Sequence, residues 1–233
     1  NPKINKTIEY ETYTMPDPSF LGKSVLIAGH DASHGSTWGD GQINYGTNNY
    51  FNSSNSTSCT SFLYVNGSYN KDLEIRQTID SGASIANYTA HGSELGWADP
   101  TFNVSHVASM TNEGKYPLMI GNACLTNKFI TPVCFGEALL RAKNKGAIGY
   151  LGASENTYWD EDFYWAVGLG TVSANPTYNG TGSGLYDKIF HTHNEAFTDW
   201  AMSSSQYIQA GNLAVTQSGS SSRLYWELYH VMG

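Results

Sequence analysis

Two short apolar runs constrain the fold of this chain most strongly, because each one ends at a residue type that enzymes use for catalysis. Residues 83–90 run directly into His91, and residues 117–123 run directly into Cys124. Such runs are typical of buried strands in an open α/β sheet, where the loops at the carboxyl ends of the strands carry the chemistry. The pattern therefore predicts a histidine and a cysteine at the ends of two neighbouring strands.

Other apolar runs and periodic segments complete an alternation of strands and helices. Further strands are expected over 23–29, near 61–65 and over 147–151, and helices over 4–14, near 41–51 and over 71–80, 104–113, 134–145, 184–197 and 202–216. Residues 225–232 fit a helix or an edge strand equally well. The alternation predicts an α/β fold with a mainly parallel sheet, and no repeat or linker divides residues 1–233.

The composition excludes two classes of protein. The net charge is -8 and Lys and Arg form no cluster, which argues against nucleic-acid binding. No apolar run approaches the roughly 18 residues of a membrane span. The chain is rich in Tyr, Ser, Asn, Thr and Gly, which favours a secreted or surface protein. Because it begins with Asn1, we expect it to be a portion of a longer protein.

The cysteine and the histidine at the strand ends suggest a thiolate–imidazole pair. Cys124 lies 33 positions after His91 (124 minus 91), and the three cysteines Cys59, Cys124 and Cys134 cannot all be paired. The alternative for Cys124 is a buried small hydrophobic side chain. We expect Cys134 to open a helix in the core and Cys59 to lie in a polar loop.

Two further features support a nucleophilic site. Gly92 has no side chain, so its N–H could approach a substrate carbonyl, and the N–H of Cys124 could supply a second donor. Asp31 follows a third strand and could hold the imidazole of His91 in one tautomer. The alternative for Asp31 is a solvated loop carboxylate.

Two histidine pairs could bind a metal but lack the context of known metal motifs. They are His30 with His34, and His191 with His193. Neither pair has a His-Glu-x-x-His context or a cysteine partner, so solvated surface histidines are the favoured interpretation. The sequence predicts no metal site from them.

Several segments resemble a known family, the gingipains, which are secreted bacterial cysteine endopeptidases with a caspase-like fold. The segments are residues 88–94, 97–100, 121–124, 134–137, 158–165 and 225–231. The similarity extends from about Ile4 to the C-terminus. It is closest to the lysine-specific members, because the arginine-specific ones lack the tryptophan-rich segment 159–165.

The resemblance implies a caspase-like α/β fold with a mainly parallel central sheet and helices on both faces. Residues 1–233 would form a single catalytic subdomain, without the N-terminal subdomain that precedes it in the family. Carried over by motif, Cys124 matches the nucleophile, His91 the catalytic histidine and Asp31 the acidic third member. Gly92 and Cys124 match the oxyanion-hole donors.

The resemblance also implies a pocket for the residue before the scissile bond. Asp162 and Thr89 match its polar residues, Trp159 its apolar wall, and Asn122 lines it. A single carboxylate in an aromatic slot suits the ammonium of lysine on its four-carbon stem. The alternative for Asp162 is an exposed acidic turn or a structural cation site.

These features predict a secreted or cell-surface cysteine endopeptidase that cleaves proteins or peptides after a basic residue, with lysine preferred. The resemblance implies no catalytic cofactor, allows a structural calcium ion, and suggests an N-terminal subdomain or a propeptide as partner. Two alternatives remain open, namely the same chemistry with an arginine or non-basic preference, and an inactive adhesin module. The chain departs from the family at Ala123, where the family has a second cysteine.

Overall fold

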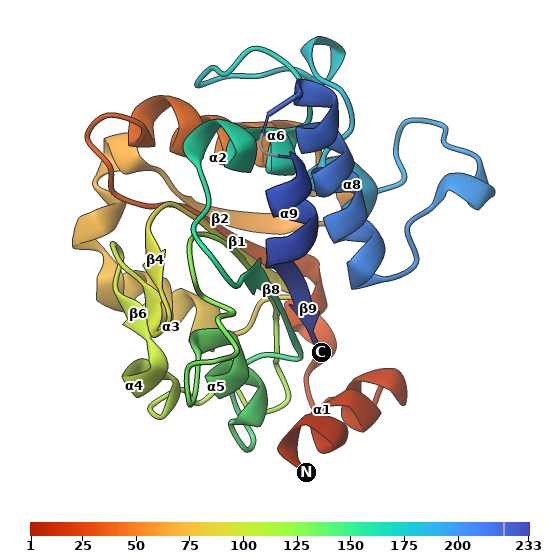
Figure 1. Cartoon of the computed structure of the whole chain (residues 1–233). Helices are drawn as coiled ribbons and strands as arrows, with labels where there is room; N and C mark the ends of the chain where they lie inside the picture. The colour runs from red at the N-terminus through yellow and green to blue at the C-terminus, as the bar shows by residue number, and fades with distance from the viewer. Residues whose placement is uncertain (221) are drawn as a thin grey trace.

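A six-stranded sheet forms the centre of the molecule (Figure 1). The structure is a computed structural model that describes residues 1–220 and 222–233. In spatial order the strands are β2 (Ser58–Phe62), β1 (Lys23–Ala28), β3 (Ile85–Thr89), β7 (Leu118–Asn122), β8 (Gly149–Ala153) and β9 (Tyr229–Met232). The first five strands pair in parallel and β9 pairs with β8 in the antiparallel sense. The predicted mainly parallel sheet is therefore confirmed.

Helices cover both faces of this sheet (Figure 1). One face carries α3 (Asp72–Asp80), α4 (Val104–Val107) and α5 (Phe135–Arg141), and α1 (Pro2–Glu11) contacts α5. The opposite face carries α2 (Asp40–Asn49), α6 (Trp159–Val167), α7 (Leu185–Ile189), α8 (Ser204–Ser218) and α9 (Ser222–Leu228). This arrangement of three layers is the expected one.

Alternation along the strands divides the apolar core into two halves. In β1, Val25 and Ile27 contact the layer of α3, whereas Leu26 and Ala28 face the layer of α2 and α6. Both halves are fully enclosed, so the central strands are apolar on both faces. That burial explains why the strands read as continuous apolar runs in the sequence.

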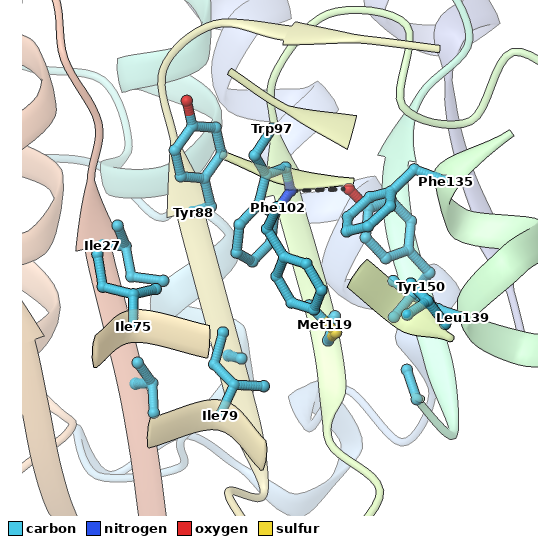
Figure 2. Close-up of a cluster of buried hydrophobic side chains, with 14 of the residues drawn as sticks. Ile27, Ile75, Ile79, Tyr88, Trp97, Phe102, Met119, Phe135, Leu139 and Tyr150 are labelled. Carbon is cyan, nitrogen blue, oxygen red and sulfur yellow. Dashed lines mark hydrogen bonds between the residues drawn. The ribbon is translucent and has the colours of Figure 1, made fainter. Parts of the chain in front are cut away.

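A second, small antiparallel sheet follows His91 and was not predicted. It consists of β4 (Gly92–Ser93), β5 (Gly96–Trp97) and β6 (Phe102–Asn103), strands too short to show any periodicity. Trp97 fixes it to the main core, because its ring stacks on Tyr88 at 4.7 Å and its Nε1–H donates to the hydroxyl of Tyr150 at 3.2 Å (Figure 2). The loop that carries His91 is therefore held by buried aromatic packing.

Several predicted elements have different bounds. The helix expected over 104–113 ends at Val107, because Ser109 bonds back to a carbonyl and Thr111 bonds to Asp80 instead of continuing the helix. The helix expected over 184–197 ends at Ile189. Residues 222–228 and 229–232 form a helix and then an edge strand, so both alternatives occur in succession.

One further prediction needs correction, and one helix was not predicted. Cys59 does not lie in a polar loop but in β2, opposite Ser24 of β1. The tryptophan-rich segment forms helix α6, which the sequence did not predict as a helix. Three acidic residues lie in its first turn, where they interact favourably with the helix dipole.

Helix α1 is anchored by a buried lysine. The ammonium group of Lys6 donates to the carbonyls of Leu139, Lys145 and Ala147 at 3.1, 3.0 and 2.8 Å, and the residue is only 2% exposed. Burial lowers the pKa of Lys6 to about 8. The hydrogen bonds of Lys6 to backbone carbonyls therefore hold α1 in place, because the outer face of this helix makes few apolar contacts.

Candidate active site

Four polar residues follow the carboxyl ends of four adjacent parallel strands. Asp31 follows β1, His91 follows β3, Cys124 follows β7 and Thr157 follows β8. These strands are neighbours in the same order in the sheet. The carboxyl edge of a parallel sheet is where open α/β folds place their sites, so the topology gathers these groups along one rim.

The register of β3 and β7 accounts for the spacing of the histidine and the cysteine. Thr89 pairs with Asn122, an offset of 33 positions (122 minus 89). His91 and Cys124 each lie two residues beyond this pair and have the same offset. The two residues therefore leave the sheet at one level on adjacent strands.

Asp31 holds the imidazole of His91. Its Oδ2 lies 2.8 Å from His91 Nε2, and its Oδ1 lies 3.0 Å from His34 Nδ1 and accepts the N–H groups of Ser33 and His34. Partial burial would raise the pKa of Asp31, but the bonds from His91 and His34 outweigh it and hold this pKa well below its usual range. Asp31 is therefore a partly buried, ionised carboxylate bonded to the imidazole rather than a solvated loop carboxylate.

Trp159 lies between the two histidines. Its ring stacks on His34 at 4.9 Å and meets the ring of His91 edge-on at 5.5 Å. The histidine loop and helix α6 are thus in direct contact through this tryptophan. Among the predicted pocket residues, Trp159 is the one that contacts the imidazole.

The sulfur of Cys124 is partly exposed and contacts Thr157. The N–H of Thr157 donates to Sγ at 3.3 Å, and the hydroxyl and carbonyl oxygens of Thr157 both lie 3.7 Å from Sγ. Among the described residues, no hydrogen bond joins Sγ to His91. The structure therefore places the two groups on one rim but turns the thiol toward the β8–α6 loop.

The backbone near the sulfur is tightly packed. A Cβ atom added to Gly92 would lie 2.7 Å from the carbonyl oxygen of Cys124, so only glycine fits there. Leu125 has a φ of 65°, which turns the chain sharply after the cysteine. No backbone hydrogen bond given for residues 1–220 and 222–233 uses the N–H of Cys124. Gly92 and Cys124, the predicted oxyanion-hole residues, therefore lie in contact.

Asp162 lies buried beneath this rim. Its Oδ2 accepts the Thr157 hydroxyl at 2.6 Å, and its Oδ1 accepts the hydroxyls of Tyr225 and Tyr229 at 2.8 and 3.0 Å. Burial raises the pKa of Asp162 to about 7, although the three hydroxyl donors favour the ionised form. The alternative of an exposed acidic turn is therefore wrong, because Asp162 is only 6% exposed.

Thr89 and Asn122 lie on the face of the sheet that α6 covers. Both residues are 1% exposed, and they are direct partners across β3 and β7. The amide of Asn122 donates to the carbonyl oxygen of Asp162 at 2.9 Å and accepts the hydroxyl of Tyr229. The hydroxyl of Thr89 has no hydrogen-bond partner among the described residues, which leaves a buried polar group without a protein partner.

Four residues of this site were missed in the sequence, namely Thr157, Tyr225, Tyr229 and His34 as a partner of Asp31. Tyr225 and Tyr229 lie 63 and 67 positions after Asp162, and the N–H of Thr157 meets the sulfur of Cys124 33 positions away, so no local pattern could reveal these contacts. His34 was noted only as half of a metal pair. Its spacing of three residues from Asp31 was the available signal.

The described part of the chain offers no ready cation site, since no three His, Cys, Asp or Glu side chains gather there as metal ligands. The histidines of the two pairs contact other groups instead. His34 bonds to Asp31, while His193 stacks on Tyr178 at 3.6 Å and His191 on Trp200 at 4.3 Å. None of the helices among the described residues is long and apolar enough to cross a bilayer.

Comparison with known proteins gives a consistent result along the whole chain. The model of peptidase family C25 matches residues 2–233. A Lys-gingipain of Porphyromonas gingivalis is 42% identical over 240 residues, which cover 99% of this chain and 13% of that protein. A gingipain R2 of the same species is 29% identical over 165 residues, or 67% of this chain and 22% of that protein. The chain thus spans a small part of the relatives that it matches.

Solved structures agree with the fold. A structure described as a protease superposes with a TM-score of 0.91 at 41% identity, covering all of this chain and 51% of that one. A complex of the pro- and mature domains of an arginine-specific gingipain of Porphyromonas gingivalis superposes with a TM-score of 0.75 at 21% identity, which shows the fold alone. The caspase-like fold prediction is confirmed.

Proposed function

The chain belongs to peptidase family C25, and from this membership we propose that it is the catalytic part of a cysteine endopeptidase. One observation carries the proposal. Cys124 and His91 leave neighbouring strands at the same level, and Asp31 is bonded to the imidazole. A thiol, a base and an orienting carboxylate are the groups that acyl transfer by cysteine requires.

The hydrogen bond of His91 Nε2 to Asp31 leaves Nδ1 to exchange a proton with the thiol. Because the sulfur faces Thr157 here, this exchange requires a side-chain rotation. The thiolate then attacks the peptide carbonyl, and the N–H groups of Gly92 and Cys124 stabilise the oxyanion. The C–N bond breaks as His91 protonates the leaving amine, and water hydrolyses the resulting thioester.

The buried carboxylate of Asp162 supports a preference for lysine over arginine. A guanidinium binds a carboxylate best with two parallel N–H bonds, one to each oxygen. Both oxygens of Asp162 already accept hydroxyl groups, which leaves no free pair of oxygens for such a fork. An ammonium group needs only one acceptor direction on the carboxylate, and the hydroxyl of Thr89, which has no partner among the described residues, is a second candidate acceptor.

The matched relatives support two further parts of the proposal. We infer that the whole protein is exported to the cell surface or the medium, as expected for a gingipain-like peptidase, and that it acts on proteins or peptides. A propeptide is the expected partner, by analogy with the complex of pro- and mature domains that shares this fold. No cofactor takes part in the proposed reaction.

The test is active-site labelling of the whole protein that contains this chain. We expect a lysyl chloromethylketone to alkylate Cys124 rapidly, as located by peptide mapping, and an arginyl analogue to react much more slowly. The Cys124→Ala variant should hydrolyse no lysyl amide. Amidolysis by that variant would overturn the assignment of the nucleophile, and alkylation no faster than that of a free peptide thiol would favour the inactive binding module.

A further inference from the structure

Thr157 contacts both the nucleophile and the pocket carboxylate. Its backbone N–H donates to the sulfur of Cys124 at 3.3 Å, and its hydroxyl donates to Asp162 Oδ2 at 2.6 Å. The same hydroxyl oxygen lies 3.7 Å from the sulfur. One side chain therefore spans the distance between the reacting atom and the group proposed to bind the substrate side chain.

The hydroxyl of Thr157 has a single proton, which it can donate in only one direction at a time. In the structure this proton is used by Asp162, so the hydroxyl oxygen faces the sulfur as an acceptor. That arrangement suits a neutral thiol, because an S–H can donate to the oxygen. It gives a thiolate no help beyond the backbone N–H.

A ligand ammonium group beside Asp162 changes this balance. The ammonium donates to the carboxylate and replaces the donor that Thr157 supplied. The Thr157 hydroxyl can then rotate and donate to the sulfur, which favours the thiolate. An occupied pocket would in this way yield a more reactive nucleophile than an empty one.

We propose that Thr157 is a positioning residue that couples occupancy of the lysine pocket to the reactivity of Cys124. This inference rests on the proposed function, because it takes Asp162 as the acceptor of the substrate ammonium. It goes beyond that function by making the pocket a switch for the thiol as well as a determinant of specificity. Cleavage after lysine would then exceed what binding of the side chain alone provides.

The experiment measures alkylation of Cys124 by iodoacetamide at pH 8 with and without saturating n-butylammonium, which resembles a lysine side chain without its backbone. The wild-type protein, Thr157→Ser and Thr157→Val are compared. Serine keeps the hydroxyl, whereas valine keeps the shape and the backbone N–H. Each variant is judged by its own ratio of rates, so a change in its basal rate cancels.

We expect n-butylammonium to accelerate alkylation roughly threefold to tenfold in the wild type and in Thr157→Ser, the size of one typical hydrogen bond. The ratio should be close to one in Thr157→Val, and n-butanol should have no effect on any of the three. Equal acceleration in Thr157→Val would show that the ammonium acts through space and would overturn the coupling. No acceleration in the wild type would overturn it as well.

Competition separates failure of the coupling from failure of the pocket. If n-butylammonium inhibits lysyl amide hydrolysis competitively but leaves the alkylation ratios unchanged, only the coupling is wrong. If it does not compete at all, the lysine pocket is wrong and the coupling falls with it. If the wild-type protein shows no amidolysis that depends on Cys124, the proposed function itself is refuted.

Discussion

Replacing Asp162 by asparagine should remove the preference for lysine. Asparagine keeps the shape of the side chain and removes its charge, and the residue is only 6% exposed. Truncating one partner of a buried, hydrogen-bonded charge pair costs about 2 to 4 kcal/mol. Each 1.4 kcal/mol is a factor of ten, so kcat/KM for a lysyl amide should fall roughly 30-fold to 700-fold.

The assay compares a lysyl amide with the norleucyl amide, which has the same four-carbon stem without the ammonium. The norleucyl rate should change by less than about threefold in Asp162→Asn, because no charge pair is lost. Asp160→Asn is the matched control. Asp160 is an exposed carboxylate in the first turn of the same helix, and within the described part of the chain its one side-chain partner is the indole of Trp38 at 2.7 Å.

A retained ratio of lysyl to norleucyl hydrolysis in Asp162→Asn would refute the reasoning. A fall of equal size for both substrates would also refute it, because it would show that asparagine disturbs the site as a whole. The expected outcome is a selective loss for lysine, with an unchanged profile in Asp160→Asn. Circular dichroism of both variants checks that the fold is intact.

Four further predictions concern pH and packing. Because burial raises the pKa of Asp162 to about 7, KM for a lysyl amide should fall as pH rises through 7 while KM for the norleucyl amide does not, measured by initial rates. Between pH 3.8 and about 7, the folded state holds a proton on Asp162 that the unfolded state has lost. The free energy of unfolding should therefore fall as pH rises through this range, and urea titrations of wild type and Asp162→Asn check the sign. Lys6→Met should lower the free energy of unfolding by about 1 to 3 kcal/mol by urea titration, because two buried carbonyls and one partly buried carbonyl lose the hydrogen bonds of the ammonium group. Gly92→Ala should reduce kcat at least about tenfold with a smaller change in KM, because its Cβ would press on the carbonyl of Cys124, and an unchanged kcat would contradict the role of this backbone.

The strand ends of the site could be predicted from the sequence, whereas the pocket could not be built from it. His91 and Cys124 follow apolar runs that are buried on both faces, and such runs are visible without any knowledge of the fold. The site residues themselves were assigned by resemblance, and that assignment stays a prediction.

The missing part of the site depends on long-range packing. Tyr225 reaches Asp162 because α6 and α9 both pack against α8, which brings together residues 63 positions apart. The bond of Thr157 to the same carboxylate is local, five positions apart, but its backbone N–H also meets the sulfur of Cys124, 33 positions away, and the sequence does not show that contact. Strands as short as β4 (Gly92–Ser93) show no periodicity in the sequence, so the small sheet that follows His91 could not be predicted.

The relative position of the sulfur and the imidazole depends on the register of β3 and β7. A slip of one residue between these strands would displace sulfur and imidazole by about 3.3 Å and turn each neighbouring side chain to the opposite face. Aromatic packing opposes such a slip, because the ring of Tyr88 in β3 stacks on the ring of Trp97. Smaller side chains in this aromatic stack should therefore reduce the catalytic rate while most of the molecule stays folded. Aromatic packing away from the site thus helps to hold the sulfur and the imidazole in their relative positions.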